Sequence, residues 1–581
     1  MAIHQHLLNL VELCVRKGIR QAVISPGSRS APLTLALARH PAMQTRVVAD
    51  ERSAGFIAIG IAQQIRQPVA VVCTSGSAVY NLAPAVAEAY FQEIPLLVLT
   101  ADRPKEWTHQ LDGQTIYQTE IFGKHVKQSF ELPADVVHPD ARWFAERVSN
   151  EAVELARTEP RGPVHINLPL REPLYPTADE PFTFGPVRVI EQVPTTPALA
   201  PETWHRLQDE WESAERKLIA VGQGPHDPAL LAVLKKMADE WRIPVVGDVI
   251  SNLPRNGDFI TQLDVFLNLS DQKIRKALRP DLLITCGQSF ISKQFKLFLR
   301  SNPPRQHWQI QPHTRLADPF QSLTRLIPYS PAAFFEKLFS DIDYQRFVSN
   351  DDETDSDESF QQQWQTLDRR ATRLVRHFLK DDTVFHEWAV VQRLLDALPT
   401  DSQLHVANSM PVRYVNLCGL DEAQQVEVFA NRGTSGIDGC LSTAVGAALT
   451  TSKTVTALTG DVAFFYDRNA LWNNLVPKNL RVIVLNNHGG NIFRIIDGPA
   501  RQPELDAYFE TSQPLSAENT AHDARMDYSK VTSYAELQAV LPHFFTESDR
   551  PKLLEIETDR RTNAEQFGRY KQVVQELNPS T

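Results

Sequence analysis

The stretch GDVAFFYDRNALWNNLVPKNLRVIVLNNHGGNIF, residues 460–493, decides the fold. It begins at the end of one apolar run, TVTALTG (454–460), and includes a second, RVIVL (481–485), and both runs have the composition of buried strands. The segment between them completes a strand–helix–strand unit, which is typical of a parallel sheet covered on both faces. Asp461 and the pair Asn486–Asn487 therefore follow the carboxyl ends of parallel strands, the edge where open α/β sheets bind ligands.

The residue types at this edge favour a divalent metal and a diphosphate. Asp461 offers a carboxylate oxygen and Asn487 an amide oxygen, and the tight bend HGG can turn the Gly489 carbonyl toward the same point. Three oxygen ligands that leave room for phosphate oxygens and water suit Mg²⁺ or Mn²⁺. A helix that begins near Val462 can add backbone N–H groups to a diphosphate. The alternative is an ordinary strand–helix–strand unit with a polar turn.

The same alternation of strands and helices recurs along the chain. We predict strands at 22–25, 46–50, 69–74, 95–102, 164–169, 217–224, 243–249, 281–287, 307–313, 404–409, 426–432, 454–461, 480–487 and 551–557. The Pro/Thr-rich segment 176–201 and the acidic run from Asp351 to Glu358 have linker composition. We therefore expect an α/β protein of three domains, 1–185, 190–350 and 360–581, each a mostly parallel sheet flanked by helices.

Composition excludes several classes of protein. The chain has 581 residues and a net charge of −11, which argues against a dedicated nucleic-acid binder. No apolar run approaches the ~18 residues of a membrane helix, and the N-terminal residues 1–20 have the pattern of an amphipathic helix. The five cysteines are widely spaced and form no CxxC pair, so we expect a cytoplasmic protein without a disulfide framework or zinc site.

Other motifs are incomplete. VGQGPHD (221–227) resembles a dinucleotide fingerprint, but Asp227 stands where the third glycine is needed, so a tight structural turn is the simpler interpretation. GTSGI (433–437) has Ile437 where a nucleophile elbow needs glycine, and HEWAV (386–390) lacks the second histidine of a zinc helix. There is no GxxxxGK[ST] loop. Kinases, zinc hydrolases and serine hydrolases are therefore disfavoured.

The stretch 460–493 resembles the thiamine-diphosphate signature, a Gly-Asp-Gly followed by Asn-Asn. Here 24 residues separate Asp461 from Asn486, which falls within that pattern, and Val462 replaces the third glycine. The segment VVADERSAGFIAIGIA (47–62) resembles the part of these enzymes that carries the activating glutamate, with Glu51 as the acid. In that superfamily the cofactor bridges two subunits, so the resemblance implies a homodimer or homotetramer with active sites between subunits.

Six further motifs narrow the resemblance. They are ISPGSRSAPLTLAL (24–37), TSGSAVYNLAPAVAEAY (74–90), LTADRP (99–104), GQTIYQ (113–118), NSMPVR (408–413) and NRGTSGIDGCLSTAVG (431–446). Together they closely resemble the 2-succinyl-5-enolpyruvyl-6-hydroxy-3-cyclohexene-1-carboxylate synthase (MenD) family of menaquinone biosynthesis. The resemblance covers the whole chain and is densest in the outer domains. In the middle domain it rests mainly on Ser292–Lys293, and Gln294 departs from relatives with a second basic residue.

The resemblance implies a thiamine-diphosphate-dependent transferase that decarboxylates 2-oxoglutarate and adds the resulting carbanion to isochorismate. Both substrates are dianions, so an acidic protein must gather cations at the site. The implied substrate-binding residues are Ser28, Arg29, Arg103, Gln114, Lys293, Ser409, Arg413 and Arg432. The implied cofactor-binding residues are Glu51, Ser435, Gly436, Ile437, Asp461, Val462, Ala463, Asn487, Ile492 and Phe493, with Asp461, Asn487 and Gly489 as metal ligands and Glu51 as the catalytic acid.

Three competing interpretations remain open at this stage. An acetolactate-synthase-like carboligase or decarboxylase would share the cofactor, although the arginine-rich motifs argue against small neutral substrates. A nicotinamide dehydrogenase would need the incomplete VGQGPHD motif to work. An inactive scaffold homologue should have lost Glu51 or Asp461, and both are present.

Overall fold

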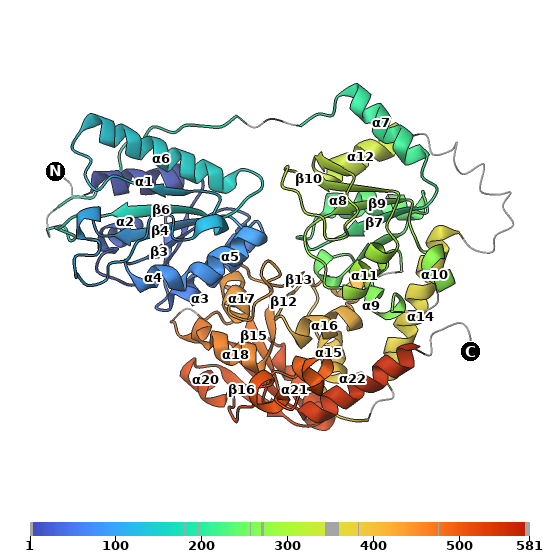
Figure 1. Cartoon of the computed structure of the whole chain (residues 1–581). Helices are drawn as coiled ribbons and strands as arrows, with labels where there is room; N and C mark the ends of the chain where they lie inside the picture. The colour runs from blue at the N-terminus through green and yellow to red at the C-terminus, as the bar shows by residue number, and fades with distance from the viewer. Residues whose placement is uncertain are drawn as a thin grey trace.

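The computed structural model describes residues 4–575 except 178–179, 194, 196, 256, 269–271, 343–358, 381–382 and 475. The described residues form three parallel sheets with helices packed around them, as Figure 1 shows. The α/β fold class with three mostly parallel sheets is therefore confirmed. The acidic run 351–358 lies outside the described residues. Within them, no helix combines the length and the apolar character needed to cross a membrane.

The first sheet has the strand order β2-β1-β3-β4-β6-β5. Its strands are β1 Gln21–Ile24, β2 Gln44–Val47, β3 Val69–Cys73, β4 Leu96–Asp102, β5 Ser129–Glu131 and β6 Val164–Pro169. Its helices are α1 Gln5–Arg16, α2 Ala31–Arg39, α3 Glu51–Ile65, α4 Ser77–Asn81, α5 Ala83–Phe91 and α6 Pro139–Arg157. The short edge strand β5 was not predicted from the sequence.

The middle sheet has the order β11-β10-β9-β7-β8. Its strands are β7 Lys217–Val221, β8 Val245–Gly247, β9 Leu282–Cys286, β10 Gln306–Gln311 and β11 Arg325–Pro328. Its helices are α7 Pro201–Glu212, α8 Pro228–Asp239, α9 Leu263–Phe266, α10 Gln272–Ala277, α11 Lys293–Ser301 and α12 Pro331–Asp341. The edge strand β11 was also not predicted.

The third sheet has the order β13-β12-β14-β15-β17-β16, which repeats the order of the first sheet strand for strand. Its strands are β12 Gln403–Val406, β13 Glu427–Phe429, β14 Val455–Gly460, β15 Leu480–Asn486, β16 Asp527–Val531 and β17 Lys552–Glu557. Its helices are α14 Phe360–Lys380, α15 Glu387–Asp396, α16 Met410–Cys418, α17 Cys440–Ala448, α18 Asp461–Asp467, α19 Ile492–Ile495, α20 Glu518–Asp523, α21 Tyr534–Phe544 and α22 Arg560–Gln575. Of these strands, β16 was not predicted.

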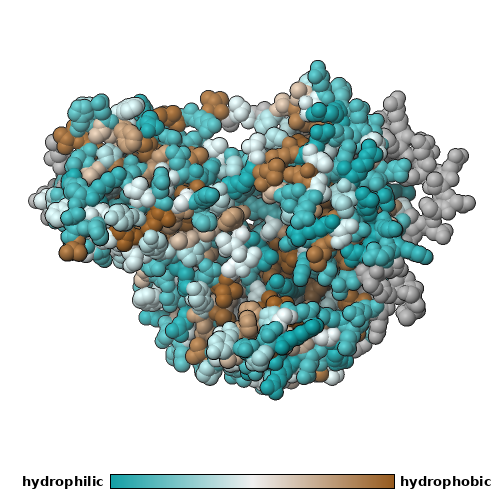
Figure 2. Space-filling view, viewed as in Figure 1, coloured by the Kyte–Doolittle hydropathy of each residue, from teal (hydrophilic) through white to brown (hydrophobic). Residues whose placement is uncertain are grey.

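Two segments connect the domains. The described residues between 176 and 200 contain no helix or strand. In the view of Figures 1 and 2, the segment crosses above a notch between the first and middle domains. Part of it is held to the first domain, because Lys17 Nζ donates to the Ile190 carbonyl at 2.7 Å. The long helix α14 contacts the middle domain: Asp368 accepts the backbone N–H groups of Thr261 and Gln262 at 2.8 and 2.7 Å.

Equivalent helices of the first and third sheets pack against each other through glycines. A Cβ atom on Gly60 of α3 would lie 2.0 Å from the Thr443 carbonyl oxygen, and one on Gly446 of α17 would lie 2.1 Å from the Ile57 carbonyl oxygen. The helices therefore meet backbone to backbone, inside one hydrophobic core that includes residues of both domains. This contact places the first sheet against the diphosphate-motif sheet.

We expect Gly60→Ala to destabilise the protein, because its methyl group would meet backbone that cannot move independently. Overpacking costs about 1–3 kcal/mol, which exceeds the gain of up to ~1 kcal/mol from alanine's helix propensity. Gly568→Ala is the matched control: this glycine is exposed on α22 and has no atom within 4 Å of an added Cβ. Thermal denaturation should show a lower Tm for Gly60→Ala and an equal or higher Tm for Gly568→Ala. A Gly60→Ala protein as stable as the parent would contradict the proposed close packing.

Candidate active site

The carboxylate of Asp461 lies at the carboxyl end of β14, where α18 begins. Its Oδ1 accepts the Val462 N–H at 2.8 Å, and its Oδ2 accepts the Gly489 N–H at 2.7 Å and Gln513 Nε2 at 2.9 Å. Burial raises the pKa of Asp461 to about 6. These bonds connect the ends of β14 and β15, so the two halves of the 460–493 motif meet as the sequence predicts.

Asn487 presents a free oxygen at the same edge. Its side chain is buried, its Nδ2 donates to Glu387 Oε1 at 2.5 Å, and its Oδ1 has no hydrogen-bond partner. An unpartnered buried amide oxygen is costly unless a ligand completes it. Glu387, at the start of α15, was not predicted as part of the site. It lies 100 residues from Asn487 in the chain, and burial raises its pKa to about 7.

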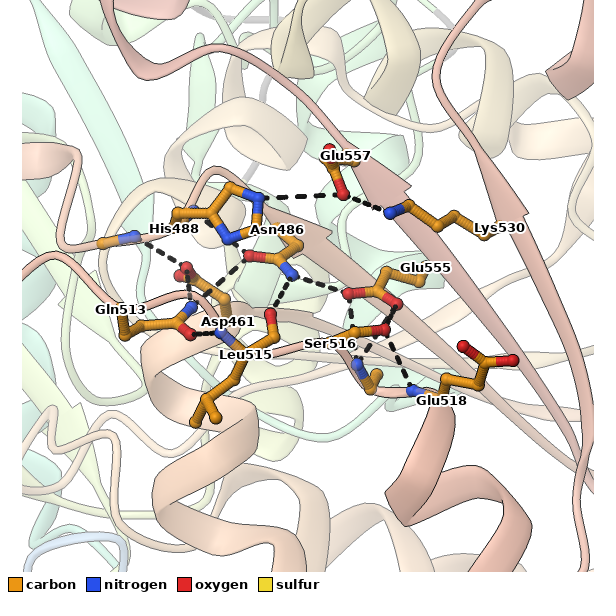
Figure 3. A network of polar contacts seen from close by, with 12 residues as sticks. Asp461, Asn486, His488, Gln513, Leu515, Ser516, Glu518, Lys530, Glu555 and Glu557 are labelled. Atoms are coloured by element: carbon orange, nitrogen blue, oxygen red, sulfur yellow. Dashed lines mark hydrogen bonds and ion pairs between the residues drawn. The ribbon is translucent and has the colours of Figure 1, made fainter.

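Asn486, the last residue of β15, has different partners from Asn487, which follows the strand. Its Nδ2 donates to Glu555 Oε1 at 2.6 Å and to the Leu515 carbonyl at 3.0 Å, and its Oδ1 accepts the His488 N–H at 3.1 Å. Figure 3 shows this network, which extends from Asp461 to Glu555. Asn486 thus braces the turn after β15 and leaves Asn487 as the amide that faces the candidate site.

The HGG segment turns sharply, as expected. His488 has φ +61°, and the Gly489 carbonyl accepts the Asn491 N–H at 3.0 Å. A carbonyl oxygen has a second lone pair, so this bond leaves Gly489 able to act as a ligand. The side chain of Asn491 is buried, and neither its Nδ2 nor its Oδ1 has a partner. The sequence analysis missed Asn491, although a polar residue between HGG and the apolar Ile492 was a usable signal.

These donors fit a hard divalent cation. The buried Asp461 carboxylate and the free Asn487 oxygen supply oxygen ligands, the type that Mg²⁺ prefers. A bound cation would also offset the burial that disfavours ionised Asp461. Among the described residues, no group of three or more His, Cys, Asp and Glu side chains could hold a metal ion.

The loop 431–439 brings the predicted apolar wedge to this edge. Ile437 packs against Ala407, Cys440 and Ala463, and Ala463 belongs to the first turn of α18. Two flanking residues of the predicted cofactor set, Ser435 and Gly436, lie in the same loop. Two more, Ile492 and Phe493, are half-buried in α19, just after the HGG turn. The loop and both ends of the diphosphate motif therefore converge.

Arg413 and Arg432, which lies in this loop, form one group of cations. Arg413 donates to the Ser409 carbonyl at the start of α16, and Arg432 Nη1 donates to Asn408 Oδ1 at 2.8 Å. Burial is the main cause that lowers the pKa of each arginine, and the Arg413 charge adds to the effect on Arg432. Two partly buried like charges side by side are a site that an anion would stabilise.

The middle domain contributes a cation that the sequence analysis did not name. Lys293 is exposed at the start of α11, whereas Lys296, one turn later, is half-buried. Burial lowers the pKa of Lys296, and the neighbouring Arg432 charge acts in the same direction. Gln294, the departure from the family pattern, donates its backbone N–H to Asp264 at 3.0 Å.

Arg29 and Arg103 form a second group at the carboxyl edge of the first sheet. Arg29 is buried and donates to the Leu170 carbonyl at 3.2 Å. Arg103 pairs with Asp112 at 2.9 Å and donates through Nε to the Gly113 carbonyl at 3.1 Å. Burial lowers the pKa of Arg29, and the Arg103 charge contributes in the same direction, so the two guanidinium groups lie near each other.

Glu51 and the neutral donors lie at this same edge. Glu51 is the first residue of α3, and its Oε2 accepts Asn81 Nδ2 from α4 at 3.1 Å. Ser28 and Gln114 are exposed, and Gln114 has φ +58°. Within the part of the chain that the structure describes, no hydrogen bond or ion pair joins Glu51, Arg29 or Arg103 to Asp461 or Asn487. One chain thus brings the predicted residues together in two separate groups.

Comparison with known proteins supplies the family. Residues 9–128 match the family model described as "Thiamine pyrophosphate enzyme, N-terminal TPP binding domain", and residues 196–406 match "Middle domain of thiamine pyrophosphate". A 2-succinyl-5-enolpyruvyl-6-hydroxy-3-cyclohexene-1-carboxylate synthase of Cytophaga hutchinsonii is 44% identical over 98% of this chain and 99% of its own. The chain belongs to this synthase family. Synthases of the same name from Flavobacterium johnsoniae and Porphyromonas gingivalis are 38% and 39% identical, over 95% and 96% of this chain and 95% and 94% of their own.

Membership in the synthase family confirms the interpretation drawn from the sequence motifs. The chain is a thiamine-diphosphate-dependent enzyme, a transferase. The dehydrogenase interpretation fails on the same matches. The structure explains the VGQGPHD segment differently: Asp227 caps α8 by accepting the Ala229 and Leu230 N–H groups, and a Cβ on Gly222 would lie 2.2 Å from the Gln288 carbonyl oxygen. The glycine there permits close packing of two loops.

Proposed function

We propose that this synthase decarboxylates 2-oxoglutarate and adds the resulting carbanion to isochorismate, giving 2-succinyl-5-enolpyruvyl-6-hydroxy-3-cyclohexene-1-carboxylate in menaquinone biosynthesis. The observation that carries the proposal is the free, buried Asn487 oxygen at the same sheet edge as the buried Asp461 carboxylate. It stands in a chain that matches synthases of that name over almost its full length. Two groups of arginines suit two dianionic substrates.

Asp461, Asn487 and the Gly489 carbonyl would hold Mg²⁺ or Mn²⁺, and the metal would hold the diphosphate. Val462, Ala463, Ser435, Gly436, Ile492 and Phe493 would line the cofactor. Ile437, packed on Ala463, would support the bend that brings the two cofactor rings together. When bound, thiamine diphosphate supplies a nucleophilic carbon and an electron sink for the carbanion.

Glu51 would hydrogen-bond the aminopyrimidine ring through its carboxyl group and hold the proton that sets the ring tautomer. Asn81 orients that carboxyl by donating to Oε2. The arginines would bind the substrate carboxylates by paired hydrogen bonds, with Ser28, Gln114, Ser409 and Lys293 as further contacts. Positioning and charge then account for much of the rate, since the motifs contain no second obvious acid–base pair.

We further propose that the working enzyme is a homodimer or homotetramer in the cytoplasm, with its domains at 1–185, 190–350 and 360–581. Two observations support a shared site. Glu51 has no polar link to Asp461 or Asn487 among the described residues of its own chain. Large aromatic side chains are exposed on the first domain (Tyr80 and Phe91) and on the third domain (Tyr466 and Trp472). An approaching second chain would cover them and bring its own diphosphate motif to Glu51.

The direct test is incubation of the enzyme with thiamine diphosphate, Mg²⁺, 2-oxoglutarate and isochorismate, followed by mass analysis. We expect the named product and one equivalent of CO₂. Replacing 2-oxoglutarate and isochorismate by pyruvate tests the acetolactate-synthase-like alternative. Acetolactate formation without activity on the dianions would overturn the proposal.

Arg103→Ala and Arg413→Ala should impair the use of the dianionic substrates far more than cofactor binding. Hydrogen bonds to charged groups contribute about 1.5–3 kcal/mol, so each loss should lower kcat/KM about 10- to 100-fold. Steady-state titration of each substrate with each variant will assign the arginines. Arg501→Ala, an arginine with 79% of its side chain exposed, is the matched control and should leave kcat/KM unchanged. If both site variants behave like this control, the two arginines do not bind substrate, and the proposal that the enzyme uses two dianionic substrates fails.

A further inference from the structure

A buried glutamate of the first domain holds the loop 431–437 of the third domain. This loop carries four predicted site residues, Arg432, Ser435, Gly436 and Ile437. Glu88 lies on α5 with 1% of its surface exposed. Its carboxylate accepts the Gly433 N–H at 2.8 Å, the Thr434 N–H at 2.6 Å and the Thr434 hydroxyl at 2.6 Å. Gln92, one turn along α5, donates a further hydrogen bond. The acid and the loop are 345 residues apart in sequence.

The contact between α5 and the loop depends on a close approach of backbones. A Cβ atom on Gly433 would lie 2.6 Å from the Glu88 carbonyl oxygen. The loop therefore lies directly on α5, where the carboxylate accepts the N–H groups of Gly433 and Thr434. Charge-assisted hydrogen bonds of this kind are about twice as strong as neutral ones.

The other side of the loop is held by its own domain. Asn408 Nδ2 donates to the carbonyls of Asn431 and Gly436 at 2.6 and 2.7 Å, and Asn408 Oδ1 accepts Arg432 Nη1 at 2.8 Å. Arg432 lies between Asn431, which Asn408 holds, and Gly433, which Glu88 holds, and Ile437 directly follows Gly436, which Asn408 also holds. The loop position therefore depends on Asn408 from the third domain and on Glu88 from the first.

Glu88 also belongs to the charge balance of Arg432. The groups that face this guanidinium are the cations Arg413 and Lys296 and the carboxylates Asp248 and Glu88. Burial and Arg413 lower the pKa of Arg432, and Asp248 and Glu88 oppose them. A neutral residue at position 88 would remove one of the charges that stabilise Arg432 in its buried place.

We propose that Glu88 is a positioning residue, which ties the first domain to the loop 431–437 and so holds Arg432 toward substrate and Ile437 toward the cofactor. The proposal rests on the proposed function, because that function assigns the roles of Arg432 and Ile437. Glu88 itself would touch neither the substrate nor the cofactor. Its effect passes through the backbone of Gly433 and Thr434.

The test compares Glu88→Gln, Thr434→Val and a matched control, Asp368→Asn. Asp368 is likewise a buried carboxylate that accepts two neighbouring backbone N–H groups from another domain, those of residues 261 and 262, but no predicted site residue lies there. Three quantities are measured for each full-length protein: Tm, the Kd of thiamine diphosphate with Mg²⁺ by calorimetry, and KM and kcat for both substrates.

Glu88→Gln should raise the KM of at least one dianionic substrate about tenfold or more and should weaken cofactor binding, because Arg432 and Ile437 both lie in the loop that Glu88 holds. Thr434→Val, which removes only one of the three donors on this loop, should shift the same quantities in the same direction by about two- to tenfold. Their double variant should change KM by less than the product of the single changes, because both substitutions act on the bond from the Thr434 hydroxyl to residue 88. Asp368→Asn should lower Tm and leave KM and cofactor Kd within about twofold.

Glu88 has no positioning function if Glu88→Gln lowers Tm as the control does and leaves KM and cofactor Kd unchanged. Should Glu88→Gln fail to fold, Thr434→Val decides alone by the same criterion. Failure of the proposed function is separate: it would be seen as no product from the parent enzyme, and the cofactor Kd would still test Glu88.

Discussion

Glu51→Gln should lower turnover by about 10²–10⁴-fold and leave the Kd of thiamine diphosphate within a few-fold of the parent. The amide keeps the size of the side chain and a hydrogen bond to Asn81, but it cannot exchange the proton that sets the tautomer of the aminopyrimidine. In the proposed site the metal and the diphosphate would supply most of the affinity, and the residues proposed to hold them lie on the third domain. Single-turnover kinetics and calorimetry on the same preparation separate the two effects.

The matched control is Glu202→Gln, a glutamate in the first turn of α7 in the middle domain. It removes the same charge near a helix start without touching the first or third sheet, and its turnover should equal that of the parent. A Glu51→Gln enzyme that also keeps near-parental turnover would show that Glu51 is a helix-start acid without a catalytic part.

Asp461→Ala should weaken cofactor binding in the presence of Mg²⁺ by more than about 100-fold. Replacing a residue that only orients a metal ligand already costs about 10- to 100-fold in metal affinity or activity, and Asp461 is proposed to be a ligand itself. The change removes the proposed carboxylate ligand and would leave only neutral oxygens to face the metal and the diphosphate. It also frees the Gly489 N–H and Gln513, which now meet at Oδ2, so the turn after β15 loses an anchor. Titration of thiamine diphosphate at several Mg²⁺ concentrations measures the loss.

Asp467→Asn provides the comparison for Asp461→Ala on the same helix. Asp467 is buried and accepts the N–H and the hydroxyl of Ser442, both at 2.7 Å, at the opposite end of α18. Its loss should lower Tm and keep the metal dependence of cofactor binding. If the two variants bind the cofactor equally well, Asp461 is not a metal ligand.

The strands that the sequence analysis missed share a physical cause. β5, β11 and β16 flank central strands at sheet edges, and each is half-exposed or short. Ser129–Glu131 and Asp527–Val531 contain no apolar run, because an edge strand needs to bury only one side or a few residues. Central strands such as Leu480–Asn486 are buried throughout, and their apolar runs are visible in the sequence.

The sequence alone contained the α/β class, the central strands, the diphosphate motif and the family, because burial on both faces of a parallel sheet and local turn geometry leave short-range patterns. Only the tertiary structure assigned the partners of those residues. Glu387 directs the amide nitrogen of Asn487 and leaves its oxygen free, and Glu88 holds a loop 345 residues away. Such pairings leave no periodic pattern in the chain, since they arise when separate elements pack and each buried polar atom must find a partner.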